Sequence, residues 1–321
     1  MSLRPDALVV TPAIDGVDGI SEVTRQSAVA MAGHWRAGGV AIWSLAGRRP
    51  DLLPSRVVFE SAGGSRRRFI LHALGEARRS WRGATVFAAH LQVAPVALPL
   101  VARGASLAVF LHGIEAWVPV RAREHAALAR ATLLANSQWT VDRFREVNPS
   151  LASRPVTVCP LGVGPAVDPV DPGDAGYALI VGRLAADERY KGHDQLLDAW
   201  PEVVRAVPGA RLIVAGDGDD RSRLEAEAAA RGLGASIQFR GRVSPPELEG
   251  LYRRARVFVM PSTREGFGLA YLEAMRAGLP VIACPGAASE IVDANRSGLL
   301  VPQEPAAIAA ALITLFRDPE A

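Results

Sequence analysis

The sequence predicts an α/β protein built from two Rossmann-like, doubly wound domains, and three observations carry this prediction. Short runs rich in Val, Ile and Leu alternate with helical patterns, as in parallel sheets joined by helical crossovers. The alternation stops at residues 160–177, rich in Pro, Gly and Asp, and then restarts. The 321 residues are 49% hydrophobic, enough to bury two cores. We therefore expect domains over residues 1–165 and 166–321.

Each domain is expected to hold its own series of strands and helices. The first has strand patterns at 7–11, 40–45, 56–60, 84–90, 106–112, 132–136 and 157–160, and helical patterns at 20–37, 66–80, 121–130 and 138–147. The second has strand patterns at 177–182, 210–216, 236–241, 256–261, 279–284 and 298–302, and helical patterns at 193–206, 220–231, 246–254, 267–277 and 305–317. Ligands of such sheets bind outside the carboxyl ends of the strands, so we expect the domains to face each other across a cleft.

Charge is distributed unevenly between the two halves. Residues 1–165 hold 19 Arg against 11 Asp and Glu, a net +8, whereas residues 166–321 hold 17 Lys and Arg against 22 Asp and Glu, a net −5. A basic half suits nucleic acid, an anionic membrane or phosphorylated substrates. Because zinc-ligand spacing and interleaved basic and aromatic residues are both missing, no nucleic-acid partner is expected.

Cysteine usage and the N-terminus both indicate a cytoplasmic protein. Cys159 and Cys284 lie far apart in apolar runs, which is typical of buried thiols in a reducing compartment. The stretch MSLRPDALVVTPA is too short an apolar run for a secretory signal. The apolar region 84–112 is interrupted by Pro and Gly, which favours strand, helix and strand over a membrane span.

The arginine-rich segment 66–83 leaves one alternative open. Its apolar residues, expected on one helical face, are Phe69, Ile70, Ala73, Leu74, Ala77 and Trp81. We expect that face to lie in the core, with solvated arginines around it. Peripheral contact with the inner face of a membrane is the alternative.

Lys191 is the only lysine among 36 Lys and Arg residues. It stands beside Gly192, before a predicted helix, while Arg183 follows a strand that ends at Gly182. An ammonium is a compact charge and a guanidinium is a planar fork, so the two are not interchangeable at a tight anion site. Both cations emerge at the carboxyl end of a strand, where they could neutralise a leaving diphosphate without a metal.

The stretch REGFGLAYLEA, residues 264–274, combines two carboxylates with a glycine-rich turn. Gly266 and Gly268 let backbone amides approach an anion at the start of a helix. Glu265 and Glu273 could accept hydroxyls of two different sugars. If the segment were wholly helical, the eight-residue separation of Glu265 and Glu273 would span about 12 Å, the scale of a nucleotide diphosphate sugar.

Two weaker patterns have structural alternatives. The stretch AGDGDD, 215–220, lacks the third glycine of a dinucleotide fingerprint. Its Asp217 and Asp219 resemble a metal-binding pair, but we expect these aspartates to cap a helix starting near 220, and we expect no metal. His112 ends a strand and could contact a donor sugar or serve as a structural hydrogen-bond partner.

At these residues the chain resembles the retaining GT-B glycosyltransferases of group 1 (family 4). The resemblance spans nearly the whole chain and is strongest from Gly182 to Pro302. The shared motifs are the Glu265 and Glu273 pair, GRL with KG (182–184 and 191–192), FRGRV (239–243), G-x-P-V-I (278–282), LHG (111–113) and NSQWT (136–140).

The resemblance implies a GT-B fold and a function for each motif. Arg183 and Lys191 would hold the diphosphate, Glu273 the ribose, and Glu265 would face the donor sugar together with His112. The other implied donor contacts are Gly19, Arg242, Val243, Gly266, Phe267, Gly268 and Leu269. Chemistry would need no metal, no cofactor and no protein nucleophile, because the leaving phosphate can accept the acceptor's proton.

The implied activity is transfer of a mannose- or glucose-type hexose from a GDP- or UDP-sugar. The acceptor would be a glycan or a lipid-linked sugar in cell-envelope or exopolysaccharide synthesis. Two departures favour alternatives: Asp18 precedes Gly19 where the family often has two glycines, and the chain ends before the family's crossover helix. The alternatives are a non-catalytic nucleotide-sugar-binding subunit and a phosphorylase or epimerase of the same fold.

Overall fold

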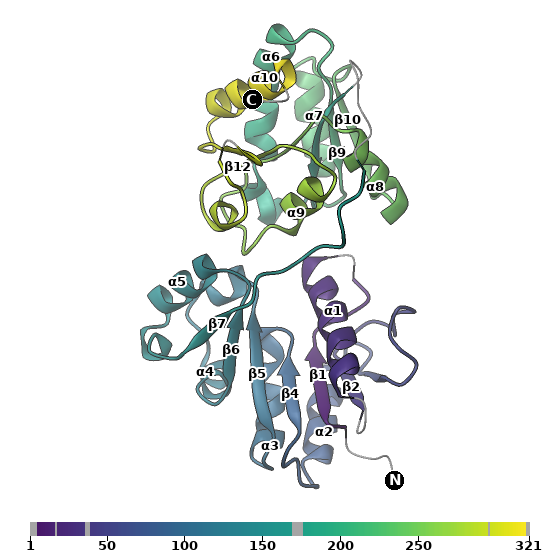
Figure 1. Ribbon diagram of the computed structural model, residues 1–321, viewed down its shortest axis with the longest axis vertical. Helices are drawn as coiled ribbons and strands as arrows, with labels where there is room; N and C mark the ends of the chain where they lie inside the picture. The colour runs from purple at the N-terminus through teal and green to yellow at the C-terminus, as the bar shows by residue number, and fades with distance from the viewer. Residues whose placement is uncertain (1–4, 17, 36–38, 169–175, 295, 319–321) are drawn as a thin grey trace. The chain divides into compact units, whose positions relative to one another are not determined.

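The computed structural model describes residues 5–16, 18–35, 39–168, 176–294 and 296–318. The chain forms two compact units, Met1–Leu161 and Gly162–Ala321, so the division lies slightly before the boundary expected after residue 165. Figure 1 shows that each unit is a sheet flanked by helices. Residues 169–175 of the expected linker lie outside the described residues.

The N-terminal unit has a parallel sheet in the order β3-β2-β1-β4-β5-β6-β7. Its strands are β1 (Ala7–Thr11), β2 (Val40–Ser44), β3 (Val58–Ser61), β4 (Thr85–Ala88), β5 (Ser106–Leu111), β6 (Thr132–Ala135) and β7 (Val156–Val158). Its α-helices are α1 (Gly19–His34), α2 (Arg66–Glu76), α3 (Leu98–Val101), α4 (Ala122–Leu128) and α5 (Gln138–Val147). The strand order reverses between β1 and β4, as in a doubly wound fold.

The C-terminal unit has a parallel sheet in the order β10-β9-β8-β11-β12-β13. Its strands are β8 (Ala178–Val181), β9 (Leu212–Ala215), β10 (Ile237–Gly241), β11 (Val257–Met260), β12 (Val281–Ala283) and β13 (Gly298–Leu300). Its α-helices are α6 (His193–Ala206), α7 (Arg221–Ala230), α8 (Pro245–Arg254), α9 (Leu269–Arg276) and α10 (Pro305–Arg317). This is the Rossmann strand order, reversing between β8 and β11.

The central strands are buried because helices cover both faces of each sheet. Every residue of β1, β9 and β11 is buried, which explains why these strands read as continuous apolar runs rather than as an alternating pattern. The region 84–112 folds as β4, the 3₁₀ helix η1 (Leu91–Ala97), α3 and β5, in agreement with the predicted strand, helix and strand. Among the described residues, no helix combines the length and the apolarity that a membrane crossing requires.

The apolar face predicted for the arginine-rich segment is wrong in part. Phe69, Ala73 and Trp81 are buried as expected, but Ile70 and Leu74 are 49% and 50% exposed. The reason is geometric: Phe69 and Ala73 are four residues apart and share the buried face of the helix, whereas Ile70 and Leu74 are rotated about 100° away from them. Leu71, exposed by 66%, extends this second, solvent-facing apolar stripe.

Candidate functional site

Several predicted donor-binding residues of the C-terminal unit, among them Arg183 and Glu265, lie where its strand order reverses. β8 and β11 are not consecutive along the chain, and other strands follow on either side of them in the sheet. The loop after β8 carries Gly182 and Arg183, and the loop after β11 carries Glu265. Doubly wound proteins bind ligands at this position, outside the carboxyl ends of the strands.

Lys191 ends the 3₁₀ helix η5 (Ala186–Lys191), and its side chain lies along the end of β8. A Cβ built on Gly182 would lie 3.5 Å from Cδ of Lys191. The next residue, Gly192, has φ 84°, and a Cβ there would lie 2.6 Å from the carbonyl oxygen of Pro261. Only glycine fits this turn, which packs the lysine segment against the residue that follows β11.

Arg183 and Lys191 meet at a single carboxylate. Nη2 of Arg183 lies 3.1 Å from Oε1 of Glu188, and Nζ of Lys191 lies 2.7 Å from Oε2. The structure therefore brings the two predicted phosphate-binding cations together. Glu188 was not assigned from the sequence, although its spacing of three residues before Lys191 is a recognisable helical ion-pair spacing.

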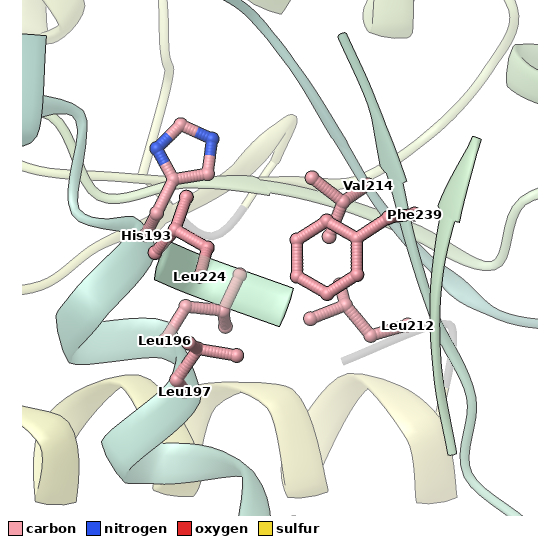
Figure 2. A pocket seen from close by; sticks show the side chains of 7 residues that line it. All are labelled: His193, Leu196, Leu197, Leu212, Val214, Leu224 and Phe239. Atoms are coloured by element: carbon pink, nitrogen blue, oxygen red, sulfur yellow. The ribbon is translucent and has the colours of Figure 1, made fainter. Parts of the chain in front are cut away.

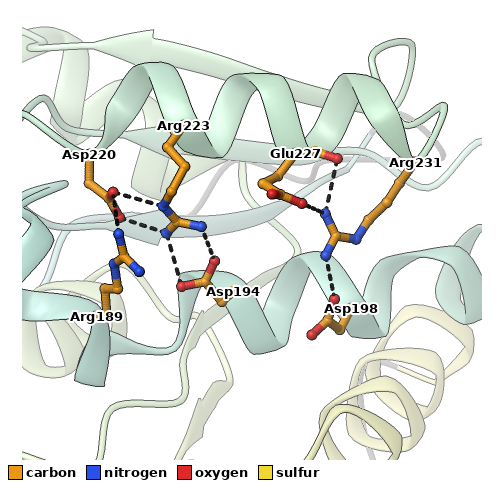
Figure 3. Close-up of polar contacts among 7 residues, drawn as sticks. All are labelled: Arg189, Asp194, Asp198, Asp220, Arg223, Glu227 and Arg231. Carbon is orange, nitrogen blue, oxygen red and sulfur yellow. Dashed lines mark hydrogen bonds and ion pairs between the residues drawn. The ribbon is translucent and has the colours of Figure 1, made fainter.

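Two aspartates, Asp219 and Asp220, hold the segment that carries Lys191, and the prediction that the aspartates of this stretch cap α7 through their side chains is wrong. Asp220 stands at the N-cap position, but its buried carboxylate pairs with Arg189 and Arg223 (Figure 3). Oδ1 of Asp219 accepts a hydrogen bond from the amide of Ala186 at 2.9 Å. For Asp220 the guanidinium donors of Arg189 and Arg223 compete better than the neutral amides of the helix end, because charge-assisted hydrogen bonds are stronger. The pairing with Arg223 lowers the pKa of Asp220.

Asp217, the remaining member of the pair that resembled a metal site, is also engaged locally. Its Oδ1 accepts the amide of Gly218 at 3.0 Å and lies 3.8 Å from Nη1 of Arg221. The aspartates of this stretch are thus explained by the loop and helix that they contact.

Glu265 is an unusual carboxylate. Burial raises its pKa, against the opposing effect of the Lys191 charge. Its Oε1 atom is buried and has no hydrogen-bond partner among the described residues. Burying a carboxylate oxygen without a hydrogen bond costs free energy, so this position favours a hydrogen-bond donor such as a ligand hydroxyl.

The glycine-rich turn precedes α9, and the helix predicted over 267–277 begins later, at Leu269. Gly268 has φ 97°, and a Cβ there would lie 2.3 Å from Cδ2 of Tyr271, so the chain cannot be helical at this point. Gly266 and Phe267 belong to the turn that leads into the N-terminus of α9. The amides at this N-terminus suit an anion. The 12 Å separation estimated for a wholly helical segment does not apply.

Glu273 lies on α9 and is held by a buried tyrosine. The hydroxyl of Tyr252, from α8, donates to Oε2 of Glu273 at 2.9 Å. Burial and the neighbouring carboxylate raise the pKa of Tyr252 well above its ordinary value. Tyr252 was missed in the sequence interpretation because α8 and α9 approach each other only in the folded structure.

Arg242 and Val243 follow β10, the edge strand, which β9 separates from β8. Arg242 is exposed, and Val243 packs against the apolar core of the unit. Their proposed contact with the donor stays a prediction.

His112, in the N-terminal unit, has well-defined structural contacts. Its Nε2 lies 2.7 Å from the carbonyl oxygen of Ala89, and its amide donates to Oε1 of Glu115 at 2.6 Å. The ring stacks on His90 at 6.0 Å between centroids. Burial lowers the pKa of His112. The ring directly follows the end of β5, and its contact with a donor sugar stays a prediction.

Asp18 has a structural explanation that the sequence interpretation did not give. Its carboxylate caps α1, accepting the amide of Ser21 at 3.0 Å and the hydroxyl of Ser21 at 2.9 Å. These hydrogen bonds lower its pKa against the effect of burial. Gly19 is the first residue of α1. The charge of Asp18 is therefore compensated within the turn.

Comparison with known proteins finds a family match for the C-terminal part of the chain. Residues 175–318 match the family described as Glycosyl transferases group 1. The C-terminal unit is a group 1 glycosyltransferase domain. A glycogen synthase of Mycobacterium tuberculosis is 32% identical over 218 residues, 66% of this chain and 50% of that protein.

A second relative and a solved structure extend the comparison. A GDP-mannose-dependent alpha-(1-6)-phosphatidylinositol monomannoside mannosyltransferase of M. tuberculosis is 40% identical over 119 residues, 35% of this chain and 31% of that protein. The chain thus spans between about a third and a half of these relatives. The structure of Anabaena Alr3699/HepE with UDP and glucose matches 98% of this chain and 90% of its own, with a TM-score of 0.75 and 20% identity. The GT-B fold predicted from the sequence is confirmed, and the facing of the domains across a cleft stays a prediction.

A small cavity in the glycosyltransferase domain adjoins the site without being part of it. His193, the residue at the start of α6, lines it with Leu196, Leu197, Leu212, Val214, Leu224 and Phe239 (Figure 2). Its volume of about 10 Å³ and its apolar wall suit neither a nucleotide nor a well-bonded water. Nε2 of His193 is buried and has no hydrogen-bond partner among the described residues.

We expect His193 to make the glycosyltransferase domain sensitive to acid. Burial, with the Lys191 charge, lowers the pKa of His193 to about 4. The unfolded chain takes up this proton near pH 6.5, so the stability contributed by neutral His193 is complete above pH 6.5 and is lost as the pH falls towards 4. Over that interval the loss is about 3 kcal/mol. Urea unfolding at pH 4.5 and 7 measures this loss of unfolding free energy. In His193→Leu the contribution of His193 to the loss should vanish. In the control His125→Leu, which replaces a partly exposed histidine, the loss should remain. An equal loss in all three proteins contradicts the assignment.

Proposed function

We propose that this protein is a retaining glycosyltransferase that moves a mannose- or glucose-type hexose from a GDP- or UDP-sugar to a glycan or lipid-linked acceptor. One observation carries the proposal. At the reversal point of the C-terminal sheet, Arg183 and Lys191 converge on one carboxylate, and Oε1 of Glu265 is buried without a hydrogen-bond partner among the described residues. Cations suit the leaving group, and an unsatisfied carboxylate oxygen suits a sugar hydroxyl.

The relatives support a nucleotide-sugar donor without deciding between the bases. One is named as dependent on GDP-mannose, and one matched structure contains UDP and glucose. In the proposed reaction the two cations stabilise the departing diphosphate, so no metal ion is required. The reaction would belong to cell-envelope or exopolysaccharide synthesis.

A ligand screen in EDTA tests this proposal. At 100 times its Kd, a ligand that binds only the folded protein adds about 2.7 kcal/mol of stability. GDP or UDP, with the matching sugar nucleotides, should raise the melting temperature by about 5 °C or more, and ADP by less. Absence of a shift with every nucleotide overturns the proposal. Binding without turnover of the donor indicates a non-catalytic nucleotide-sugar-binding subunit, and binding that needs added manganese contradicts the metal-free mechanism.

We further propose that the protein acts in the cytoplasm, at the inner face of a membrane, through the exposed stripe of α2. Ile70, Leu71 and Leu74 form this stripe. Exposed arginines surround it at positions 66, 67, 68 and 78. A helix with an outward apolar stripe and a cationic border is complementary to anionic lipid headgroups and the acyl chains beneath them.

Vesicle sedimentation distinguishes this membrane contact from an ordinary surface. We expect binding to vesicles containing phosphatidylglycerol and little binding to pure phosphatidylcholine. Leu71→Ser with Leu74→Ser should weaken binding roughly tenfold or more, since each leucine contributes about 1.5–3 kcal/mol when fully buried. Leu52→Ser, at an 82% exposed leucine outside α2, is the matched control and should bind like the wild type. Equal loss in both variants, or equal binding to both vesicles, contradicts this proposal.

A further inference from the structure

Glu188 contacts both cations of the proposed donor site. Its two carboxylate oxygens are divided between Arg183 and Lys191, at 3.1 and 2.7 Å. The Glu188 and Lys191 side chains are only 14% and 15% exposed, so the pair is poorly screened by water. A carboxylate that bridges two cations has the charge and the divided oxygens of a phosphate group.

The backbone around Glu188 is fixed at both ends. On one side, the amide of Ala186 donates to Asp219 at 2.9 Å. On the other, the carbonyl oxygen of Tyr190 accepts from the amide of Thr263 at 3.0 Å and from Nε2 of Gln303 at 2.8 Å. Glu188 itself has φ −112° and ψ 24°, outside the helical geometry of its neighbours. The carboxylate is therefore presented from an anchored segment rather than from a loose loop.

Besides burial, the negative charge of Glu188 raises the pKa of two neighbouring groups, Tyr190 and Glu265. Burial raises the pKa of Tyr190 to about 12, and the charges of Glu188 and Glu265 contribute to the rise. Glu188 also contributes to the raised pKa of Glu265. Arg183, Glu188, Lys191 and Glu265 thus form one interacting group, in which Glu188 neutralises part of the positive charge that a diphosphate would meet.

We infer that Glu188 is a resident anion of the donor site. It holds Arg183 and Lys191 at bridging positions and competes with the diphosphate for them, so that donor and product bind less tightly than the two cations alone would allow. This inference rests on the proposed function. Its consequence is that binding of the diphosphate exchanges ion pairs instead of creating them, which moderates affinity and lets the product leave.

Glu188→Gln isolates this competition because it removes the charge and keeps the size of the side chain. Titration calorimetry with GDP, UDP and inorganic pyrophosphate should show binding about tenfold tighter than in the wild type. The KM for the donor should fall with it. Asp187→Asn is the matched control: Asp187 is exposed, and within the described part of the chain it forms no ion pair, so its loss removes the same charge one residue away. We expect its affinities to equal those of the wild type.

Every other outcome contradicts either the role of Glu188 or the proposed function. If Glu188→Gln binds diphosphates more weakly, Glu188 only positions the cations, and the inference is overturned. If Glu188→Gln and Asp187→Asn tighten binding equally, the effect is general electrostatics, and the inference is again overturned. If the wild type binds none of the three probes, the proposed function itself fails. If the wild type binds them, Lys191→Ala does not, and Glu188→Gln is unchanged, only the role of Glu188 is wrong.

Discussion

Lys191→Ala should lower sugar transfer roughly 100- to 1000-fold while the protein stays folded, the loss associated with removing one contact to a developing negative charge. The ammonium is nearly buried and lies against Gly182, so water replaces it poorly. Its positive charge also opposes the rise in the pKa of Glu265, so its removal affects the neighbouring carboxylate as well. Turnover of the donor with a saturating acceptor measures the effect, and circular dichroism verifies the fold.

Two further variants test whether the loss of activity is specific to the Lys191 side chain. Lys191→Arg should also be impaired, because a planar fork does not fit where the stem passes Gly182 and Gly192 turns sharply. Arg205→Ala removes a charge from a side chain of the same domain that is 78% exposed and should leave turnover unchanged. Near wild-type activity in Lys191→Ala would falsify its assignment to the leaving diphosphate.

The elements of the fold were predictable where local chemistry sets their ends. The bounds of α5, α6 and α10 agree with the expected helices. Ser137 caps α5 by accepting the amide of Thr140, and Pro305 opens α10, and both signals are visible in the sequence. The prediction failed for α2, which was expected over 66–80 and ends at Glu76. The segment after Glu76 is held by Trp81, whose indole N–H donates to the carbonyl oxygen of Glu76 at 3.0 Å and whose amide donates to the distant carbonyl oxygen of Arg103 at 2.9 Å.

The candidate site shows the same division between local and long-range signals. Lys191 and the two glutamates stood out by residue type, spacing and flanking glycines. Glu188 did not, because nothing in a linear sequence shows that Arg183 returns to the carboxylate that Lys191 already holds. The sequence predicts a helix cap from Asp217 and Asp219, and it does not show that Asp219 and Asp220 instead meet Ala186 and Arg189, which are more than thirty residues away in the chain.

Glu265 and Glu273 also differ in their partners, and we expect their substitution to impair different steps, nucleotide binding for Glu273 and catalysis for Glu265. Glu273 lies on α9, the helix that follows the glycine-rich turn, and accepts a hydrogen bond from Tyr252. It is proposed to bind ribose hydroxyls. Those hydroxyls are alike in substrate, transition state and free nucleotide, so losing their acceptor weakens uniform binding. Glu273→Gln should therefore weaken binding of the bare nucleoside diphosphate about tenfold or more, the loss typical of a hydrogen bond to a charged group.

Glu265→Gln should instead leave that affinity nearly unchanged and lower kcat on the order of 100-fold, as for a contact made only in the transition state. Its buried Oε1 has no partner among the described residues, which suits a group that meets the transferring sugar and not the nucleotide. Calorimetry with GDP and UDP, followed by turnover of each variant, measures both effects. Tyr252→Phe serves as the control: it removes the hydrogen bond to Glu273 and should reproduce part of the affinity loss with kcat preserved. If Glu265→Gln loses nucleotide affinity while Glu273→Gln keeps it, the donor lies in the opposite orientation along α9.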